Sequence, residues 1–570
     1  MRVNEGALEL SVRDIAQASM CQWRFIRHAV RALSGDSQPI DTLIGEHVAR
    51  LSERYALDVL DHYYQAVGRR TPRYPYGVLD ADAKPAEWAG RALASGGVPG
   101  FADAHDATVI FGERLECDGL YGTVPLAVMT GDGPQIQLPR FSSHVRLAAR
   151  VEVGGYARLL ERCGAGTPAP TSLVLLASGR VVPVPTAEAV ADFDRFAAEL
   201  RPLVRRIAAD DVPDWWEASP ICGGCPECEV AIAAHDDILA VPGIGQGLRD
   251  DLAREGVRTR RDLVEARPRE VPPDSLELAE LQLAQRDLRP GPYGPQVVVR
   301  VDSRHPLLQA LPEPAPGDIY LDFENDSLWQ WTRSDHTGLI YLAGLAMRAE
   351  DGPPPAAGTV WAPPGTPAPT ESCPAPAWEH APVTPPAAGG LARATGWRYV
   401  SWWAHSRADE AALIRGLLTW LEDRRRRYPQ MRLYHYSKQE PLYLRRLARR
   451  HAMDMGRIDR LCGRGGICTD LFTVVSAAVK TGQPGQSLKD LEPLYMGPWR
   501  RGEVNDGAAS VVLYDQARDA LEVGDLAHRA RPGSHGISPV LAELAAYNEF
   551  DCVSTMLLHR WLLAQRAAHA

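Results

Sequence analysis

Lysine is scarce in this chain of 570 residues, in which 62 residues are Lys or Arg but only four are lysines: Lys84, Lys438, Lys480 and Lys489. A basic excess is also missing, because the net charge is −10, and this argues against a nonspecific polybasic coat for nucleic acid. No apolar run is long enough to cross a membrane, and residues 1–6 contain no apolar signal core. We therefore expect a cytoplasmic protein with no membrane partner.

The length predicts several domains, and the hydrophobic and charged contents of 45% and 24% are ordinary for a globular protein. Both halves contain strand and helix patterns, so we predict an α/β protein with multiple domains. The negative net charge does not exclude a nucleic-acid partner. Carboxylates gathered at a metal site repel phosphate only until the metal ions bind.

Two carboxylates share one face of a predicted strand in the C-terminal half. Residues 317–324 have strand character, and the apolar segment 339–346 is a natural hairpin partner. Because side chains alternate faces along a strand, Asp322 and Glu324 point the same way. Such a pair can hold divalent cations that activate water and stabilise the leaving oxygen of a phosphodiester. Alone, the pattern also fits a solvated strand edge.

Further polar residues follow at positions that could join this pair. Residues 541–558 predict a helix in which Tyr547 and Asp551 are four apart and share a face. Between the pair and this helix, Glu440 stands at the mouth of another predicted helix, after a short strand. Asp470 competes with Glu440 as the acid in the middle of the domain.

This order of acids resembles the DEDD exonucleases of the ribonuclease H-like superfamily. It is most similar to the predicted exonuclease domain at the C-terminus of a RecB-like nuclease family, and it covers roughly residues 316–566. The resemblance implies a site built from Asp322, Glu324, Glu440, Tyr547 and Asp551. It implies that Asp322, Glu324 and Asp551 bind two Mg²⁺ or Mn²⁺ ions and that Tyr547 orients the attacking water. Glu440 departs from the family, which usually has Asp in the middle of the domain.

The reaction implied by the resemblance is hydrolysis of a phosphodiester at a 3′ end, with DNA expected more than RNA. His435 and Lys438 precede Glu440, and we expect them to contact the substrate backbone, although a surface role fits them equally. Alternatively, the protein is a scaffold that binds nucleic acid without hydrolysing it. It would then belong to a complex with protein partners, in mobile-element or antiviral machinery.

Four cysteines predict a metal staple in the N-terminal half. Cys222, Cys225 and Cys228 follow a Cys-x2-Cys-x2-Cys spacing, and Cys21 is the remote fourth thiol, with His235 as an alternative ligand. Three thiolates within seven residues suit a metal cluster, and a reducing cytoplasm argues against disulfides. The pattern favours [4Fe-4S], with Zn²⁺ as the alternative. It resembles RecB-like nucleases that close a PD-(D/E)XK domain with an iron-sulfur staple, here over residues 1–235.

The residues that this nuclease chemistry requires are missing. The family pattern has an acid where residues 122–126 have none, and an acid-x-Lys where residues 137–140 read Gln-Leu-Pro-Arg. No lysine occurs between Lys84 and Lys438, so no placement of the strands can supply it. Arg140 is a poor replacement because its planar guanidinium stays protonated. We therefore predict a nuclease-like fold without activity at this site.

The middle of the chain connects these two domains. Residues 236–270 resemble a helix-hairpin-helix element, in which Gly243 and Gly245 could bring backbone amides to a phosphate; packing alone is the other reading. We predict that residues 271–315 are a linker that contains one helix. The resemblance implies that residues 316–570 form the exonuclease domain, which a Pro-rich insertion over residues 351–396 interrupts.

Overall fold

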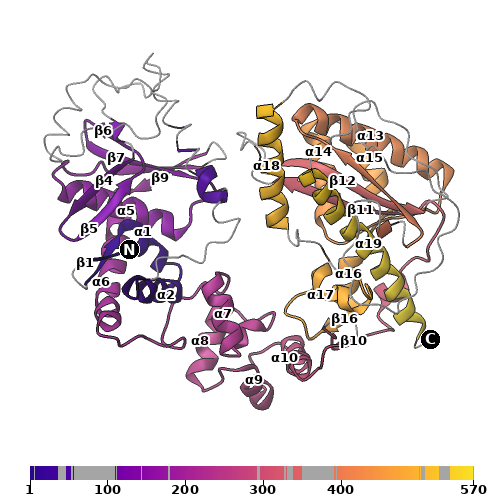
Figure 1. The fold of residues 1–570 in the computed structure, drawn as a ribbon, viewed down its shortest axis with the longest axis horizontal. Coiled ribbons are helices and arrows are strands. Elements are labelled where there is room, and N and C mark those ends of the chain that lie inside the picture. Colours follow the sequence, from indigo (N-terminus) through magenta and orange to yellow (C-terminus); the bar gives the residue numbers. More distant parts are fainter. Residues whose placement is uncertain are drawn as a thin grey trace. The chain divides into compact units, whose positions relative to one another are not determined.

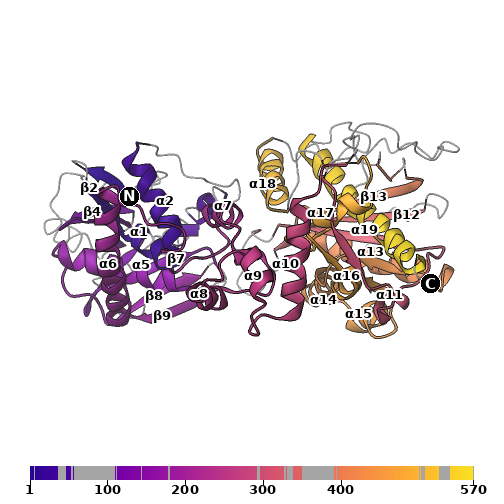
Figure 2. The ribbon, with the colours of Figure 1, turned by 90° about the horizontal axis from the view of Figure 1, so that it is seen from below.

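The computed structural model describes residues 1–4, 7–35, 47–52, 55–56, 59, 109–110, 112–142, 144–176, 180–291, 295–326, 329, 338–348, 391–392, 395–499, 501, 507–524 and 539–568. They form two compact units, one from Met1–Leu239 and the other from Ala240–Gln330 with Thr337–Ala570 (Figures 1 and 2). Most of the predicted Pro-rich insertion, residues 351–390, lies outside the described residues. None of the described helices is long and apolar enough to span a bilayer.

Two sheets form the first unit. One has the order β1-β2-β5-β4, and the other has the order β3-β6-β7-β8-β9. The strands of the first sheet are β1 (Arg2–Asn4), β2 (Ala7–Ser11), β4 (Glu113–Cys117) and β5 (Leu120–Val124). Those of the second are β3 (Val109–Ile110), β6 (Ala127–Thr130), β7 (Gly133–Arg140), β8 (Thr171–Leu176) and β9 (Val181–Pro185). Strands β7 and β8 pair in parallel, whereas the other neighbours in this sheet are antiparallel.

The helices of this unit are α1 (Val12–Ala18), α2 (Gln22–Leu33), α5 (Leu147–Arg162), α6 (Thr186–Ala208) and α7 (Pro226–Ala234). Two adjacent glycines let α6 approach α5 closely. A Cβ at Gly154 would lie 2.0 Å from the carbonyl oxygen of Ala189, and one at Gly155 would lie 2.7 Å from the ring of Phe193. The shared core is therefore built on backbone contact that larger residues would prevent.

Two features of the first unit differ from expectation. Residues 8–33, which have a helical pattern, form β2, α1 and α2, with a break at Cys21, the N-cap of α2. The extended backbone of Cys21 explains the break, because its thiol can then accept a hydrogen bond from the amide of Arg24. Cys117 and Cys163 form a disulfide, which a reducing cytoplasm does not predict.

A five-stranded mixed sheet forms the centre of the second unit, in the order β13-β12-β11-β14-β15. Its strands are β11 (Ile319–Asp326), β12 (Leu339–Arg348), β13 (Trp397–Trp403), β14 (Leu433–His435) and β15 (Cys468–Asp470). The first three pair as antiparallel neighbours, so the expected hairpin of β11 and β12 forms, whereas β11, β14 and β15 run parallel.

Helices cover both faces of this sheet (Figure 1). On one face lie α13 (Arg407–Arg427), α14 (Gln439–Arg450) and α15 (Met455–Cys462). The other face carries α16 (Leu471–Ala478), α18 (Gly507–Gly524) and α19 (Pro539–Ala567). The alternation of β11 divides its side chains accordingly, because Ile319, Leu321 and Phe323 pack toward α13–α15 while Tyr320 packs toward α19.

The segment before the central sheet also belongs to the second unit. It comprises α8 (Gln246–Arg254), α9 (Arg260–Ala266), α10 (Pro273–Arg286), β10 (Val299–Val301) and α11 (Pro306–Gln309). A 3₁₀ turn at Ile238–Ala240 spans the boundary between the units. Strand β10 pairs with β16 (Val479–Thr481), and Leu308 and Leu311 enter the core beside α19. Residues 271–315 are therefore not a linker, because they pack into the second unit, although the predicted helix is present as α10. Strand β10 has only three residues, too few to give a strand pattern in the sequence.

Candidate active site in the C-terminal unit

Three carboxylates converge where β11 meets α19. The side chains of Asp322 and Glu324 both lie on the face of β11 that packs against α19. Asp551 lies on the buried face of α19. One oxygen from each of them lies within 4.8 Å of the others. Glu324 and Asp551 are 6% and 8% exposed. The group therefore has the hard oxygen donors that divalent cations prefer.

Asn548, which the sequence analysis missed, links two of these acids. Its Nδ2 atom donates to Asp322 Oδ2 at 2.7 Å and to Glu324 Oε1 at 3.3 Å, while its Oδ1 accepts from the Tyr399 hydroxyl at 2.9 Å. Gly344 leaves space for this amide, because a Cβ there would lie 1.5 Å from Asn548 Oδ1. Asn548 thus fixes the acids without adding a charge of its own.

Burial and mutual repulsion make the ionised site costly. Burial, followed by the charges of Asp551 and Glu324, raises the pKa of Asp322 well above its ordinary value. Burial, followed by the charge of Asp551, raises the pKa of Glu324 to about 7. A bound cation would stabilise the ionised forms of all three acids. The donor set and its electrostatics therefore fit a divalent-metal site.

Glu440 lies beside this group but outside the cluster of three. It is buried at the start of α14, accepts a hydrogen bond from the Ser437 hydroxyl at 3.0 Å, and its charge contributes to the raised pKa of Asp322. The competing acid, Asp470, is the N-cap of α16, where it accepts from the amide of Phe472 at 2.9 Å. Capping accounts for Asp470 and leaves Glu440 as the better fourth acid.

His435 and Lys438, both expected at the substrate, have different positions. His435 is 1% exposed on the central strand β14, and its Nδ1 lies 2.6 Å from the carbonyl of Ser437. A substrate cannot reach it, so the expected contact is wrong; a central strand is buried on both faces. Lys438 is exposed and lines the pocket that contains Asp322.

A buried arginine is the second residue that the sequence analysis missed. Arg501 donates from Nη2 to Asp551 Oδ1 at 2.6 Å and also to Glu492, and its guanidinium carbon is 5.5 Å from the centre of the Tyr547 ring. Burial, followed by the charge of Asp551, raises the pKa of Tyr547 above its ordinary value. Its hydroxyl therefore stays protonated at neutral pH. No local pattern marks Arg501, because it follows a 3₁₀ turn in an irregular segment.

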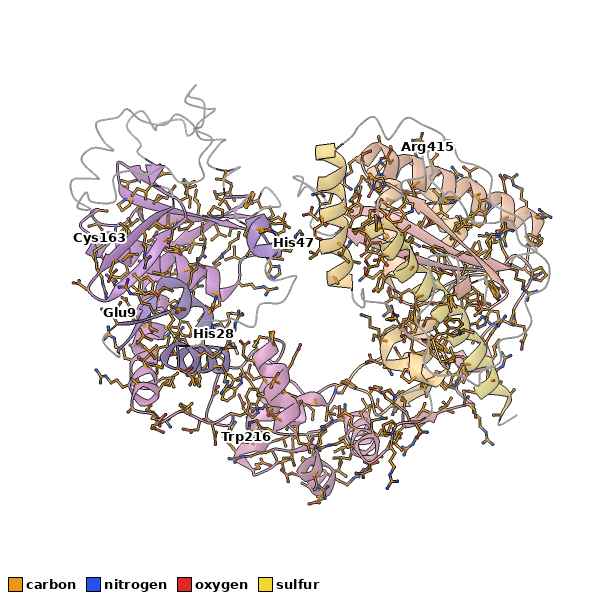
Figure 3. The ribbon with its side chains drawn as sticks, viewed as in Figure 1. Glu9, His28, His47, Cys163, Trp216 and Arg415 are labelled. Carbon is orange, nitrogen blue, oxygen red and sulfur yellow. A yellow bond between two sulfur atoms is a disulfide. The ribbon has the colours of Figure 1, made fainter. Side chains whose placement is uncertain are left out.

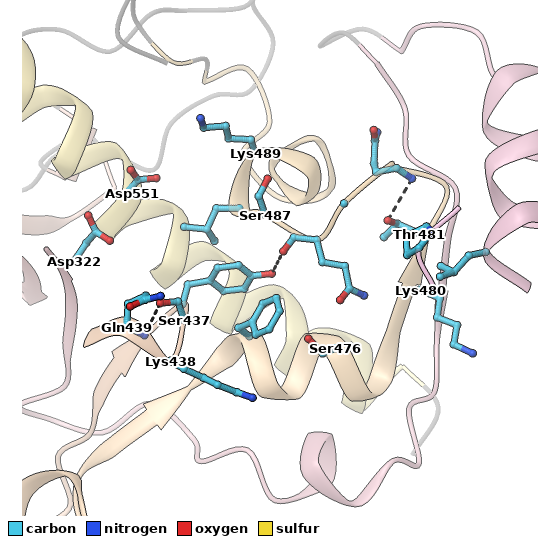
Figure 4. Close-up of a pocket in the computed structure, with 18 of the residues that line it drawn as sticks. Asp322, Ser437, Lys438, Gln439, Ser476, Lys480, Thr481, Ser487, Lys489 and Asp551 are labelled. Carbon is cyan, nitrogen blue, oxygen red and sulfur yellow. Dashed lines mark hydrogen bonds between the residues drawn. The ribbon is translucent and has the colours of Figure 1, made fainter. Parts of the chain in front are cut away.

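A pocket of about 890 Å³ opens from the acids. Figure 4 shows Asp322 and Asp551 at one end, Thr481 and Lys480 at the other, and Lys489 and Lys438 in between. Its lining also includes Pro242, Asp274 and Leu278, from the hairpin and α10. The carboxylates are thus accessible from solvent along a channel that belongs to one unit.

The four predicted cysteines also come together, in the first unit. Sγ–Sγ distances are 3.5 Å for Cys21 and Cys228, 3.8 Å for Cys222 and Cys228, and 4.0 Å for Cys21 and Cys225. Four sulfurs that each lie about 2.3 Å from one tetrahedral ion would be about 3.8 Å apart. The spacing therefore fits a single ion closely. The alternative ligand His235 instead stacks on Trp215, with ring centres 6.2 Å apart.

The position expected for nuclease chemistry in the first unit contains an internal ion pair. Arg140, at the end of β7, pairs with buried Glu152 of α5, which also accepts from the Tyr156 hydroxyl at 3.2 Å. Burial lowers the pKa of Arg140 to about 10, so it remains charged at neutral pH. Among the described residues of this unit, the cysteines form the only group of three or more potential metal ligands.

The two glycines of the predicted helix-hairpin-helix differ in their surroundings. Gly243 has φ +91°, and a Cβ there would lie 2.5 Å from the Ser275 hydroxyl, which donates to the carbonyl of Pro242 at 2.8 Å. Gly245 is the N-cap of α8, and a Cβ there would have no atom within 4 Å. Gly243 therefore allows the hairpin to pack on α10, whereas Gly245 is open to a ligand.

The mixed sheet with its three acids defines an α/β domain that has a candidate metal site. Residues 389–563 match the family model described as the RNase_H superfamily, which confirms the predicted RNase H-like domain in the C-terminal half. Strands β11 and β12, with Asp322 and Glu324, precede the matched segment. No match to the chain was found among curated proteins. The RecB-like relationship stays a prediction.

Proposed function

We propose that the C-terminal unit is a metal-dependent 3′–5′ exonuclease that hydrolyses nucleic-acid phosphodiesters, with DNA as its preferred substrate. The observation that carries this proposal is the convergence of Asp322, Glu324 and Asp551 within 4.8 Å at the end of an open pocket. The match of residues 389–563 to the RNase_H superfamily supports it independently.

In this proposal Asp322, Glu324 and Asp551 hold two Mg²⁺ or Mn²⁺ ions, and Glu440 completes the acidic set. Bound divalent ions supply an activated water and stabilise the leaving oxygen. Tyr547 orients the attacking water as a neutral hydroxyl, since its raised pKa excludes it as a base at neutral pH. Asn548 fixes the positions of the Asp322 and Glu324 carboxylates by donating a hydrogen bond to each.

We propose that Arg501 binds the substrate phosphate in the same site. Its guanidinium already contacts Asp551 at 2.6 Å and lines the pocket. Because an arginine fork can bind phosphate oxygens, Arg501 is placed to hold the phosphate at the reacting end of the strand. This would position substrate next to the acids without contributing a proton.

For the first unit we propose a binding role without hydrolysis. The ion pair of Arg140 with Glu152 supports an inactive nuclease-like fold, and the part of this unit that the structure describes contains no cluster of three carboxylates. We propose that Cys21, Cys222, Cys225 and Cys228 form its metal staple. Three of their Sγ–Sγ distances are 3.5–4.0 Å and all lie within 4.8 Å, which supports Zn²⁺ over the [4Fe-4S] cluster that the motif favours.

The test uses a 5′-labelled DNA strand incubated with the full-length protein in Mg²⁺ or Mn²⁺. Wild type should shorten the strand from its 3′ end, and Asp322→Ala with Asp551→Ala should abolish this. Asp459→Asn, a surface acid that pairs with Arg445 at 3.2 Å, is the matched control and should retain activity. Hydrolysis that persists in the double variant would refute the proposal. Tight binding by wild type without turnover would instead favour the scaffold function.

A further inference from the structure

The pocket continues well beyond the acids, to elements outside the RNase H-like match. From Asp322 and Asp551 its wall runs along residues 436–439 and 483–489 to Lys480 and Pro242. The hairpin at Pro242 is fixed to α10, because Ser275 Oγ donates to its carbonyl at 2.8 Å and Gln282 Nε2 donates to the carbonyl of Ala240 at 2.9 Å. The far wall of the pocket is thus held in place by hydrogen bonds within the same unit.

Apart from Arg501 beside the acids, positive charge along this pocket comes from lysines, in a chain that otherwise uses arginine. Three of the four lysines, Lys438, Lys480 and Lys489, line it. Lys480 is neutralised by Asp274 at 2.7 Å and by Glu277. Lys438 and Lys489 are exposed, and Figure 4 shows them on either side of the channel. Two mobile ammonium groups can follow phosphates without fixing a sequence.

The same wall offers aromatic surface beside these charges. Tyr436 and Phe472 pack edge to face with their ring centres 5.6 Å apart, and the Tyr436 hydroxyl donates to the carbonyl of Gln486 at 2.5 Å. Both rings line the pocket. Fixed aromatic rings bind bases by stacking, which requires bases that are not paired within a duplex.

We propose that this pocket holds an unpaired nucleic-acid strand, whose phosphates contact Lys438 and Lys489 and whose chain continues past Gln483 to the Pro242 hairpin. The inference rests on the proposed function and adds the substrate class and its path. It also gives the helix-hairpin-helix a role in guiding the strand that the acids cleave. A duplex would have to open before entering.

The first test measures how salt affects binding of fluorescent oligothymidylate to the full-length protein in EDTA, where hydrolysis cannot occur. Each phosphate contact on a single strand contributes about 0.7 to the slope of log K against log salt, so Lys438→Gln with Lys489→Gln should reduce the slope by about 1.4. The control Arg415→Gln, on α13 (Figure 3), should leave it unchanged. An unchanged slope in a folded lysine double variant would overturn the proposal.

The second test places a negative charge further along the path. Gln483→Glu is isosteric and should weaken binding of long strands about fivefold at low salt, while strands too short to reach it should bind as before. Gln430→Glu, an exposed position outside the pocket, is the matched control. Equal effects of Gln483→Glu on short and long strands, or preferred binding of a blunt duplex, would refute the path.

These binding experiments are separable from the proposed function. If wild type binds with the expected slope but hydrolyses nothing in Mg²⁺ or Mn²⁺, the exonuclease proposal fails and the strand path stands. If the wild type hydrolyses DNA while the lysine and Gln483 variants bind as it does, the path fails and the exonuclease proposal stands.

Discussion

Glu324→Gln should stabilise the metal-free protein at neutral and alkaline pH while it removes metal-dependent hydrolysis. Burial, followed by the charge of Asp551, raises the pKa of Glu324 from an ordinary 4.5 to about 7. The folded protein therefore holds a proton on Glu324 that the unfolded chain releases between these values. Stability must fall as the pH rises through this window, and the loss is complete above pH 7.

The size of this effect follows from the two pKa values. A rise from 4.5 to about 7 corresponds to about 3 kcal/mol of unfolding free energy. Glutamine fits the site, because its Oε1 can accept from Asn548 while its Nε2 donates to Ser510 Oγ. The Ser510 hydroxyl can then donate to the Gly507 carbonyl, 2.9 Å away. We thus expect a gain of up to about 3 kcal/mol at pH 8 and almost none at pH 4.

Chemical denaturation in EDTA at pH 5 and pH 8 measures this difference. Glu543→Gln, at a partly exposed position of α19, should show no such dependence and serves as the control. Excess Mn²⁺ at pH 8 should reverse the order, since the wild type gains binding energy that the variant lacks. If Glu324→Gln and wild type lose stability in parallel between pH 5 and pH 8, the electrostatic account of the site is wrong.

Three further predictions concern the two candidate metal sites and the ion pair of Arg140 in the first unit. Gly344→Ala should displace Asn548, whose Oδ1 would lie 1.5 Å from the new Cβ, and should weaken Mn²⁺ binding in calorimetry. Gly131→Ala, where a Cβ would have no atom within 4 Å, is the control and should leave Mn²⁺ binding unchanged. Cys228→Ala should remove one equivalent of zinc by elemental analysis and lower the melting temperature; a visible absorption band in wild type would instead indicate iron. Arg140→Lys should produce no hydrolysis in an Asp322→Ala background, because one acid and one lysine do not make a metal site; activity there would refute the inactive reading of the first unit.

The central strands and their acids follow closely from sequence, because period-two alternation fixes which face of β11 carries Asp322 and Glu324. Helical spacing likewise places Tyr547 and Asp551 on one side of α19. Two signals were present but unused. Asn548 is three residues before Asp551, and Gly344 interrupts an apolar strand, a position that often marks close approach by another group.

Other parts depend on tertiary context that local patterns do not carry. The sequence pattern predicts that His435, at a short strand, is accessible. In the structure this strand, β14, lies between β11 and β15, and all three residues of β14 are buried. Arg501 reaches Asp551 from an irregular segment without any periodic pattern. Three-residue β10 cannot be distinguished from a loop until its partner β16 is known.

The pairing of β10 with β16 has a practical consequence for dissecting the protein. A fragment starting at β11 would leave β16 without its partner strand and would remove Leu308 from the core, and both changes favour aggregation. One beginning near Ala240 would retain these partners. Expression trials should therefore cut before the hairpin, and insolubility of a shorter piece would reveal nothing about its chemistry.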